Sequence, residues 1–479
     1  MVWCWHRCFV CLMASLLLIQ QSQLYASGRF ESGSPPIDLS VSLEEVLEYG
    51  SLGKACEAYK AKPNDYNWKL KCGKFQFFYD PLGTEGVPGR LLLFLLKHFK
   101  ELVGPGFSRL GMIADPYSER GLPIGMAATR NYGDRFEAFG YTCASCHFAK
   151  LKDGRYSVGA GNFDFEYGKK SILVGVFPRL VTPFTDMDKI HPGSLELLAP
   201  YMKVLNNNKG LSLRFAVQML PLVTAGEKVP VLAYEVQDHY LSWPPGVMDF
   251  FMSPAYVDDG VHIASKVQNL WEIPRPREWG KHGMPHGMLG STGGTFDVLG
   301  FVKEFVRLGG GVPDDYKNED YGPMVEYIYS LKAPPPLRKP PAEHVAMGEK
   351  LFAERCIGCH GGSSFEGDRI YSFAEMGTDD ALRYWLDGWD LDGEPCCGLE
   401  YSGDSEFTYG VKSPRLKGLF SVQTFLHNGS VTSLEELFCI ENDRLSRGRR
   451  PHSQVGHRQT CDHLELAEKK ALISYLKSL

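Results

Sequence analysis

The chain has 479 residues, of which 44% are hydrophobic and 23% are charged, and its formal net charge is −6. This length allows two or three domains with hydrophobic cores large enough to fold without help from disulfides. The mildly acidic balance gives no indication of a nucleic-acid partner.

Residues 1–26 have the pattern of a secretory signal peptide. A short basic start at His6-Arg7 precedes an apolar run from Phe9 to Ile19, and Ala26 supplies a small residue before the cleavage point. The apolar run is too short to span a bilayer comfortably, and no later segment reaches about 18 apolar residues. We therefore expect a periplasmic or secreted protein with no transmembrane anchor after signal removal.

The region that follows, residues 27–105, contains no cysteine–histidine motif. We interpret it as an N-terminal extension that packs on the first motif-containing domain, and we expect a helix over about residues 90–102 within it. The glycines and proline of Gly121–Gly125 then predict a loop that leads towards the first motif.

Two pentapeptides, Cys143–His147 (CASCH) and Cys356–His360 (CIGCH), share one pattern. Two cysteines separated by two residues and followed by histidine form the attachment signal of c-type haem. Each thiol forms a thioether with a haem vinyl group, and the histidine becomes the proximal ligand of the iron. A zinc ribbon would need its cysteine pairs about 15–20 residues apart, and these pairs are far more distant. We therefore predict two covalently bound c-type haems (iron), held by Cys143, Cys146 and His147 and by Cys356, Cys359 and His360. Calcium is a further candidate cofactor, although no motif indicates a site for it.

The order of these motifs predicts a mainly α fold with two cytochrome c-like domains. The first c-type haem domain covers residues 106–332 and carries long loop insertions, because a minimal cytochrome c domain needs only about 80–120 residues. Its last residues, 327–332, are similar to residues 473–479 at the chain end, and both are expected to be terminal helices. Residues 333–341, with five prolines, form a linker. The second cytochrome c domain covers residues 342–479 and begins with a helix before Cys356.

The remaining cysteines indicate disulfides. Of the 13 cysteines, three lie in the signal and four in the motifs, which leaves an even number. The pairings Cys56–Cys72 and Cys439–Cys461 are favoured because they are local. Cys396 and Cys397 are either joined to each other or free.

With both motifs and the linker, the sequence resembles the dihaem cytochrome c peroxidase/MauG superfamily. Lys412–Gly418 contributes to this resemblance, and Phe425–Leu434 matches the superfamily's Tyr-x-His-(Asp/Asn)-Gly segment. Within the superfamily the chain is most similar to the rubber oxygenase (RoxA)-like branch, at Gly83–Pro88, Leu122–Gly125 and Gly246–Asp249. The chain is much shorter than the rubber-cleaving proteins, so their substrate is not carried over.

The resemblance covers about residues 75–479 and implies an exported haem oxidoreductase of cytochrome c peroxidase-like or oxygenase type. An electron-transfer haem in the C-terminal domain would feed a haem in the N-terminal domain that reacts with peroxide or dioxygen. The electron donor would be a small redox protein or a quinol-linked donor. The alternative is a non-enzymatic periplasmic electron carrier in which both haems are six-coordinate. A third hypothesis is a MauG-like enzyme that oxidises a partner protein.

The sixth ligand of the C-terminal haem departs from the superfamily pattern. The peroxidases use a methionine shortly before the last helix, and residues 377–479 contain none. Aligning the final helices places that ligand near Val455, and we therefore predict His457, which gives a bis-histidine haem. His427 is the alternative, and its other interpretation is a structural histidine.

The distal side of the N-terminal haem also departs from the superfamily. Many bacterial peroxidases have a removable histidine where this chain has Phe163. The side chains left as candidates for that iron are Met126, His282, Met284, His286 and Met288.

Two aromatic residues are assigned functional roles by the resemblance. The segment at Trp279 is similar to the superfamily's Trp-Asp-Gly segment, whose tryptophan lies between the haems as an electron bridge, and Trp271 is the alternative. Phe296 corresponds to a phenylalanine that lines the distal pocket in rubber oxygenase-like proteins.

Overall fold

A computed structural model provides the coordinates. It describes residues 39–82, 86–129, 137–181, 186–224, 232–249, 263–275, 289–293, 297–308, 317–367, 369–380, 382, 410–442, 444–446 and 455–479. All of them belong to one unit, Ile37–Leu479. The predicted signal peptide and the predicted site residues Trp279 and Phe296 lie outside the described residues.

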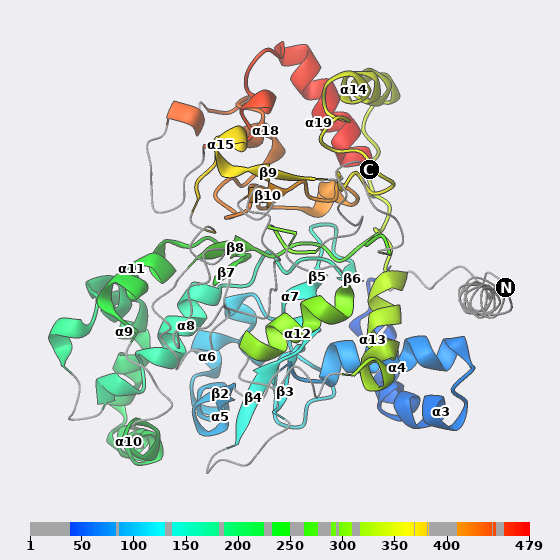
Figure 1. Cartoon of the computed structure of the whole chain (residues 1–479). Coiled ribbons are helices and arrows are strands. Elements are labelled where there is room, and N and C mark those ends of the chain that lie inside the picture. Colours follow the sequence, from blue (N-terminus) through cyan, green and yellow to red (C-terminus); the bar gives the residue numbers. More distant parts are fainter. Residues whose placement is uncertain are drawn as a thin grey trace, which may run out of the picture. The chain divides into compact units, whose positions relative to one another are not determined.

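Helices predominate over strands in the described ranges, which confirms the mainly α class (Figure 1). The α-helices are α2 (Leu43–Val46), α3 (Ala55–Ala61), α4 (Tyr66–Tyr79), α5 (Gly89–His98), α6 (Lys100–Val103), α7 (Cys143–His147), α8 (Tyr167–Gly175), α9 (Pro192–Asn207), α10 (Lys209–Thr224), α11 (Tyr234–Ser242), α12 (Val298–Leu308), α13 (Asn318–Ser330), α14 (Ala342–Arg355), α15 (Phe373–Met376), α18 (Leu434–Leu437) and α19 (Leu466–Ser478). Short 3₁₀ helices cover Glu48–Lys54, Pro105–Leu110, Arg179–Val181, Met187–Lys189, Leu419–Ser421, Arg444–Ser446 and Arg458–Thr460. The helix expected over residues 90–102 is present as α5 and α6. None of the described helices is long and apolar enough to cross a membrane.

The strands are short and pair antiparallel. They are β1 (Leu39–Ser40), β2 (Val87–Pro88), β3 (Met126–Ala128), β4 (Ala138–Tyr141), β5 (Phe148–Lys150), β6 (Tyr156–Val158), β7 (Val247–Asp249), β8 (Ala264–Lys266), β9 (Ile370–Ser372) and β10 (Gly410–Lys412). They form the sheets β1-β6-β5, β2-β4-β3, β7-β8 and β10-β9. In register, Met126 faces Tyr141 and Phe148 faces Val158. Because β4 ends just before α7 and β5 begins just after it, two sheets fix both ends of the first motif.

Helices α14 and α19 lie side by side at a very close crossing (Figure 1). A Cβ atom at Gly348 would lie 2.1 Å from the carbonyl oxygen of Ala471 and 2.7 Å from Cβ of Tyr475. One turn later, the rings of Phe352 and Tyr475 are in contact, with centroids 5.3 Å apart. Glycine is required here because only a residue without a side chain lets the two backbones approach this closely.

The same arrangement recurs between α4 and α13. A Cβ atom at Gly73 would lie 2.0 Å from the carbonyl oxygen of Pro323 and 2.7 Å from Cβ of Tyr327. The ring of Phe77, one turn after Gly73, contacts that of Tyr327 with centroids 5.7 Å apart. Thus the predicted N-terminal extension contributes a helix that packs on the last helix of the predicted first haem domain.

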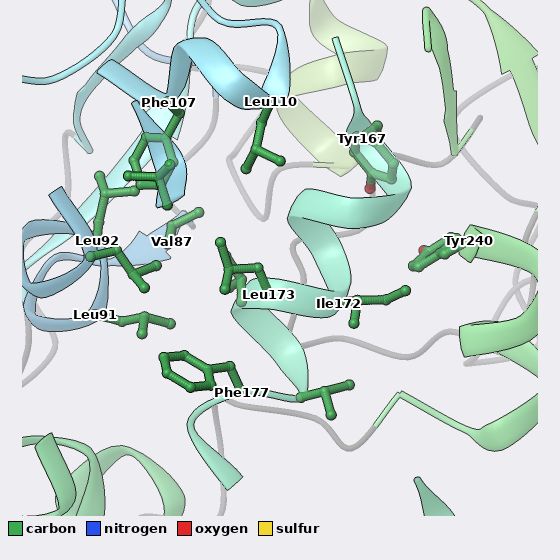
Figure 2. Packing of buried hydrophobic residues seen from close by; sticks show 14 of the residues in the cluster. Val87, Leu91, Leu92, Phe107, Leu110, Tyr167, Ile172, Leu173, Phe177 and Tyr240 are labelled. Atoms are coloured by element: carbon green, nitrogen blue, oxygen red, sulfur yellow. The ribbon is translucent and has the colours of Figure 1, made fainter. Parts of the chain in front are cut away.

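The buried apolar side chains form three clusters. The first joins α5, α8 and α11, and Figure 2 shows Ile172 and Leu173 of α8 lying between Leu91 and Leu92 on one side and Tyr240 on the other. The second surrounds α4, α7 and α13. The buried members of the third all come from residues 351–476. Residues 331–341, which include the predicted linker, contain no helix or strand.

Candidate cofactor-attachment sites

The first motif forms α7, which is held from two sides. Thr142 caps its N-terminus by accepting a hydrogen bond from Ala144 N (3.3 Å) and donates one to the carbonyl oxygen of Phe78 on α4 (3.0 Å). On the other side, a Cβ atom at Gly125 would lie 2.2 Å from Ser145 N. The predicted loop therefore reaches the motif, and the glycine is needed for its backbone to approach α7.

The thiols of the first motif are buried and unbridged. Cys143 and Cys146 are each 7% exposed, and neither belongs to a disulfide. Burial raises the pKa of Cys143 to about 12 and that of Cys146 to about 11. Both thiols are therefore protonated near neutral pH and are unbridged.

His147 is neutral and has a nitrogen without a partner. Burial lowers the pKa of its imidazole to about 4. Its Nδ1 is buried and has no hydrogen-bond partner in the part of the chain that the structure describes. Neutral imidazole is the form that ligates a metal ion.

In the second motif the histidine is oriented by its own loop. His360 is 9% exposed, and its Nδ1 lies 3.2 Å from the carbonyl oxygen of Phe365. Since a carbonyl only accepts, Nδ1 carries the proton and Nε2 presents its lone pair, as in histidine ligands whose second nitrogen is hydrogen-bonded. Burial lowers the pKa of His360 to about 4 and raises that of Cys356 to about 11, whereas Cys359 is exposed.

The ring of His457 lies close to that of His360. The ring centroids are 6.1 Å apart and the ring planes differ by 49°. Two imidazoles that bind one metal ion from opposite sides at about 2 Å have centroids about 6 Å apart. Nδ1 of His457 is buried without a partner among the described residues, and burial lowers the pKa of the ring to about 4. The centroid distance therefore matches that expected of two imidazoles that bind one metal ion.

The backbone of His457 is fixed within a closed loop. The disulfide Cys439–Cys461 encloses it. Arg444, which is fully buried, donates to the carbonyl oxygen of His457 (3.2 Å), and Thr460 donates to the same oxygen (2.9 Å). The residue adopts a positive φ of 51°, an uncommon conformation that these contacts hold in place.

His427, the alternative ligand, has partners for both ring nitrogens. Its Nε2 lies 3.2 Å from Oδ1 of Asp379, and its Nδ1 lies 3.4 Å from Oγ1 of Thr378. Asn428 also donates to Asp379, at 2.6 Å. The geometry therefore favours the structural interpretation of His427. Among the other histidines, His463 is exposed and His452 lies outside the described residues.

Trp271 lies where the two motif regions meet. It is 1% exposed, and its indole nitrogen donates to the carbonyl oxygen of Val158 (2.8 Å). The next residue, Gly159, donates its backbone N–H to the carbonyl oxygen of His147 (2.8 Å). On the C-terminal side, a Cβ atom at Gly418 would lie 2.4 Å from the indole ring. This position suits the bridging role for which Trp271 was the alternative.

The other candidates for the N-terminal site are only partly described. Met126 lies in β3 and belongs to the first hydrophobic cluster. Phe163 is buried, and its neighbour Asn162 donates its backbone N–H to the carbonyl oxygen of Cys146 (2.8 Å). The remaining candidates, His282, Met284, His286 and Met288, lie outside the described residues.

Both favoured disulfides are present. Cys56–Cys72 and Cys439–Cys461 are bridged, which confirms the local pairings, whereas Cys396 and Cys397 lie outside the description. Within the described ranges, no group of three or more His, Cys, Asp or Glu side chains is arranged to hold a metal ion.

Sequence reasoning gave no role to two cations near the motifs, Lys412 and Arg415. The only signal was their place in the Lys412–Gly418 segment, which served for the resemblance alone. Their surroundings are buried in the folded protein, which no local pattern reveals.

Comparison with known proteins gave no matching family model and no matching curated protein. Among solved structures, the chain is similar to a chain of Kuenenia stuttgartiensis hydrazine synthase pressurized with 20 bar xenon. The identity is 18% and the TM-score 0.27, over 53% of this chain and 83% of that chain. This degree of similarity carries no assignment of fold or activity.

Proposed function

We propose that the chain is an exported dihaem c-type cytochrome with oxidoreductase activity. The observation that carries the proposal is the pair His360 and His457 at a CxxCH motif. Both imidazoles are neutral, and their ring centroids are 6.1 Å apart. Cys356 and Cys359 would attach a haem covalently here, and His360 and His457 would supply two nitrogen ligands to its iron.

The first motif fits the same cofactor. Cys143 and Cys146 are protonated and unbridged, and His147 is neutral with a nitrogen that lacks a partner. When bound, c-type haem supplies one-electron chemistry at its iron, while the protein sets ligands, burial and access.

The repeated helix crossing supports two cytochrome c-like domains. In each half, a glycine on one helix contacts the backbone of the last helix, and a phenylalanine one turn after that glycine contacts a tyrosine of the last helix. The residues are Gly73, Phe77 and Tyr327 in one half and Gly348, Phe352 and Tyr475 in the other. We propose that each crossing closes one haem domain.

The two sites differ in the ligands available. With His360 and His457 both available as ligands, a haem at the second site would be suited to electron transfer. At the first site, apolar Phe163 stands where a removable histidine would be, and this supports a haem open to peroxide or dioxygen. We propose that a small redox protein or a quinol-linked donor reduces the second haem, which in turn reduces the first.

Trp271 is proposed as the electron route between the sites. It contacts the segment that follows His147 and the Arg415–Gly418 segment that packs beside the second site. Trp271→Phe removes the indole but keeps an aromatic ring. It should slow electron exchange between the haems in stopped-flow reduction while both haems remain attached. An unchanged rate would assign the route elsewhere, and Trp279 would be tested next.

The attachment proposal is tested by haem staining of a denaturing gel and by intact mass. Two haems are expected, and Cys356→Ala should remove one. A wild-type mass that carries one haem or none would contradict the proposal.

The ligand proposal is tested with matched histidine variants. His457→Gly should convert the low-spin electron paramagnetic resonance signal of the second haem to high-spin, because one axial ligand is lost. His427→Gly and the exposed control His463→Gly should keep it low-spin. If His427→Gly alone changed the spin state, the role would pass to His427.

The second candidate is a non-enzymatic electron carrier, favoured by the histidine pair at the second site. The two functions differ at the first haem. A high-spin signal in wild-type protein, altered by adding peroxide or by adding dioxygen to the reduced form, supports the enzyme. Two low-spin haems that neither oxidant affects would identify a carrier.

A further inference from the structure

Two partly buried cations, Lys412 at the end of β10 and Arg415 shortly after it, lie near both motifs. Lys412 Nζ donates to the carbonyl oxygens of Glu366 (3.3 Å) and Ser413 (3.1 Å). The Arg415 guanidinium donates to the carbonyl oxygens of Trp271 (3.2 Å) and Asn269 (2.7 Å). All four partners are neutral carbonyls, so none of these hydrogen bonds neutralises either cation.

The charges around this pair do not balance. Burial lowers the pKa of Lys412 to about 7 and that of Arg415 to about 10. The carboxylate that acts on both is Glu366, which is 2% exposed and accepts a hydrogen bond from Ser364 N (2.9 Å). Beside these two basic side chains the described residues place one buried carboxylate, so their positive charge is only partly balanced.

Donors remain open for an anion. Lys412 uses two of its three N–H groups on carbonyls, and Nη1 of Arg415 has no hydrogen-bond partner among the described residues. An Arg fork next to a Lys is suited to a carboxylate.

The position of the pair indicates which carboxylate. Hydrogen bonds connect each cation to the surroundings of one motif histidine. Lys412 donates to the carbonyl oxygen of Glu366, and the carbonyl oxygen of the preceding residue, Phe365, lies 3.2 Å from Nδ1 of His360. Arg415 donates to the carbonyl oxygen of Trp271, whose indole donates to Val158, and the residue after Val158 donates to the carbonyl oxygen of His147. Haems attached at the two motifs would bring propionate carboxylates to this part of the protein.

We propose that Lys412 and Arg415 form a shared carboxylate site that binds haem propionates at the junction of the two motifs, with Lys412 serving the haem on His360 and Arg415 the haem on His147. This inference rests on the proposed function. It adds that one cation pair sets the reduction potentials of both haems, because a positive charge near a haem favours the reduced iron.

The test uses Lys412→Met and Arg415→Met, with Lys417→Met as the matched control. Lys417 belongs to the same segment, but its ammonium lies over the ring of Phe365, 5.2 Å from the centroid. Lys412→Arg and Arg415→Lys retain the charge and remain informative where a methionine variant does not fold.

Two readouts report on the propionates directly. The propionate bending band in the resonance Raman spectrum should shift in the two methionine variants and stay unchanged in Lys417→Met. Spectroelectrochemical titration should show lower midpoint potentials, with Lys412→Met acting more on the second haem and Arg415→Met more on the first. The charge-retaining variants should restore most of each potential.

The outcomes distinguish a failure of this inference from a failure of the proposed function. Wild-type protein without covalent haem would refute the proposed function itself. Haem-loaded variants with wild-type propionate bands and potentials would overturn the carboxylate site and leave the dihaem assignment in place. A potential shift equal in Lys417→Met would also overturn it, because it would show a general charge effect.

Discussion

Replacing Gly348 with alanine should destabilise the C-terminal part of the protein, although alanine is the better helix former. The added Cβ would lie 2.1 Å from the carbonyl oxygen of Ala471, whereas a relaxed contact needs about 3.5 Å. The helices α14 and α19 would have to separate by roughly 1 Å, since a backbone carbonyl cannot turn away as a side chain does.

The magnitude follows from two opposing effects. Overpacking costs about 1–3 kcal/mol, and the backbone clash places this variant near the upper end. Alanine regains about 1 kcal/mol of helix propensity over glycine. The net loss should be about 2 kcal/mol in the free energy of unfolding.

The chain contains a matched control. Gly210 lies in α10, where the nearest atom to an added Cβ is Oδ1 of Asn208 at 3.6 Å. Gly210→Ala should therefore stabilise the protein by up to about 1 kcal/mol. Urea unfolding followed by far-ultraviolet circular dichroism measures both variants. If Gly348→Ala were as stable as wild type, the close crossing would not exist as described.

Three further predictions follow from described contacts. Gly73→Ala should lower stability by a similar ~2 kcal/mol, and its effect should add to that of Gly348→Ala because the crossings are separate. Replacing Cys439 and Cys461 with serine should cost about 3 kcal/mol in urea unfolding for a loop of this length and raise the high-spin fraction at the second haem, since His457 loses its closed loop; unchanged values would contradict this. Lys170 is 5% exposed, and burial lowers its pKa to about 7. At a pH between about 7 and the pKa of a lysine in the unfolded chain, Lys170 is protonated only in the unfolded state. The free energy of unfolding should therefore rise by up to ~1.4 kcal/mol per pH unit from pH 7 to about 10. Unfolding titrations across this range should lose that slope in Lys170→Met, and an equal slope would refute the assignment.

Sequence patterns predicted the features that depend on neighbouring residues. The helix before Cys356 follows from apolar residues at helical spacing, and α14 covers it. The local disulfides follow from an even number of cysteines close together. The preference for His457 over His427 followed from a missing methionine, and the ring positions favour it.

The features that depend on distant residues could not be predicted. Helix α4 buries Lys74 and Gln76, and Gln76 bonds to Asp320 O and Met324 N on α13. Because these polar residues lie on the buried face of α4, its apolar residues do not show a clear helical periodicity. The sequence therefore did not indicate a packing partner far along the chain. The resemblance named Trp279 as the bridge and Trp271 as the alternative, and the sequence could not show the surroundings of Trp271, because burial between two segments leaves no local pattern.

The division of the cysteines into two classes constrains how the protein matures. Cys56–Cys72 and Cys439–Cys461 form only where thiols are oxidised, whereas the thioether chemistry proposed for the motif cysteines consumes reduced thiols. Each motif pair is itself a close dithiol that the same oxidants would join. Biogenesis must therefore keep one class reduced while the other is bridged, and a host that oxidises thiols without a reducing step would accumulate fully bridged, colourless protein.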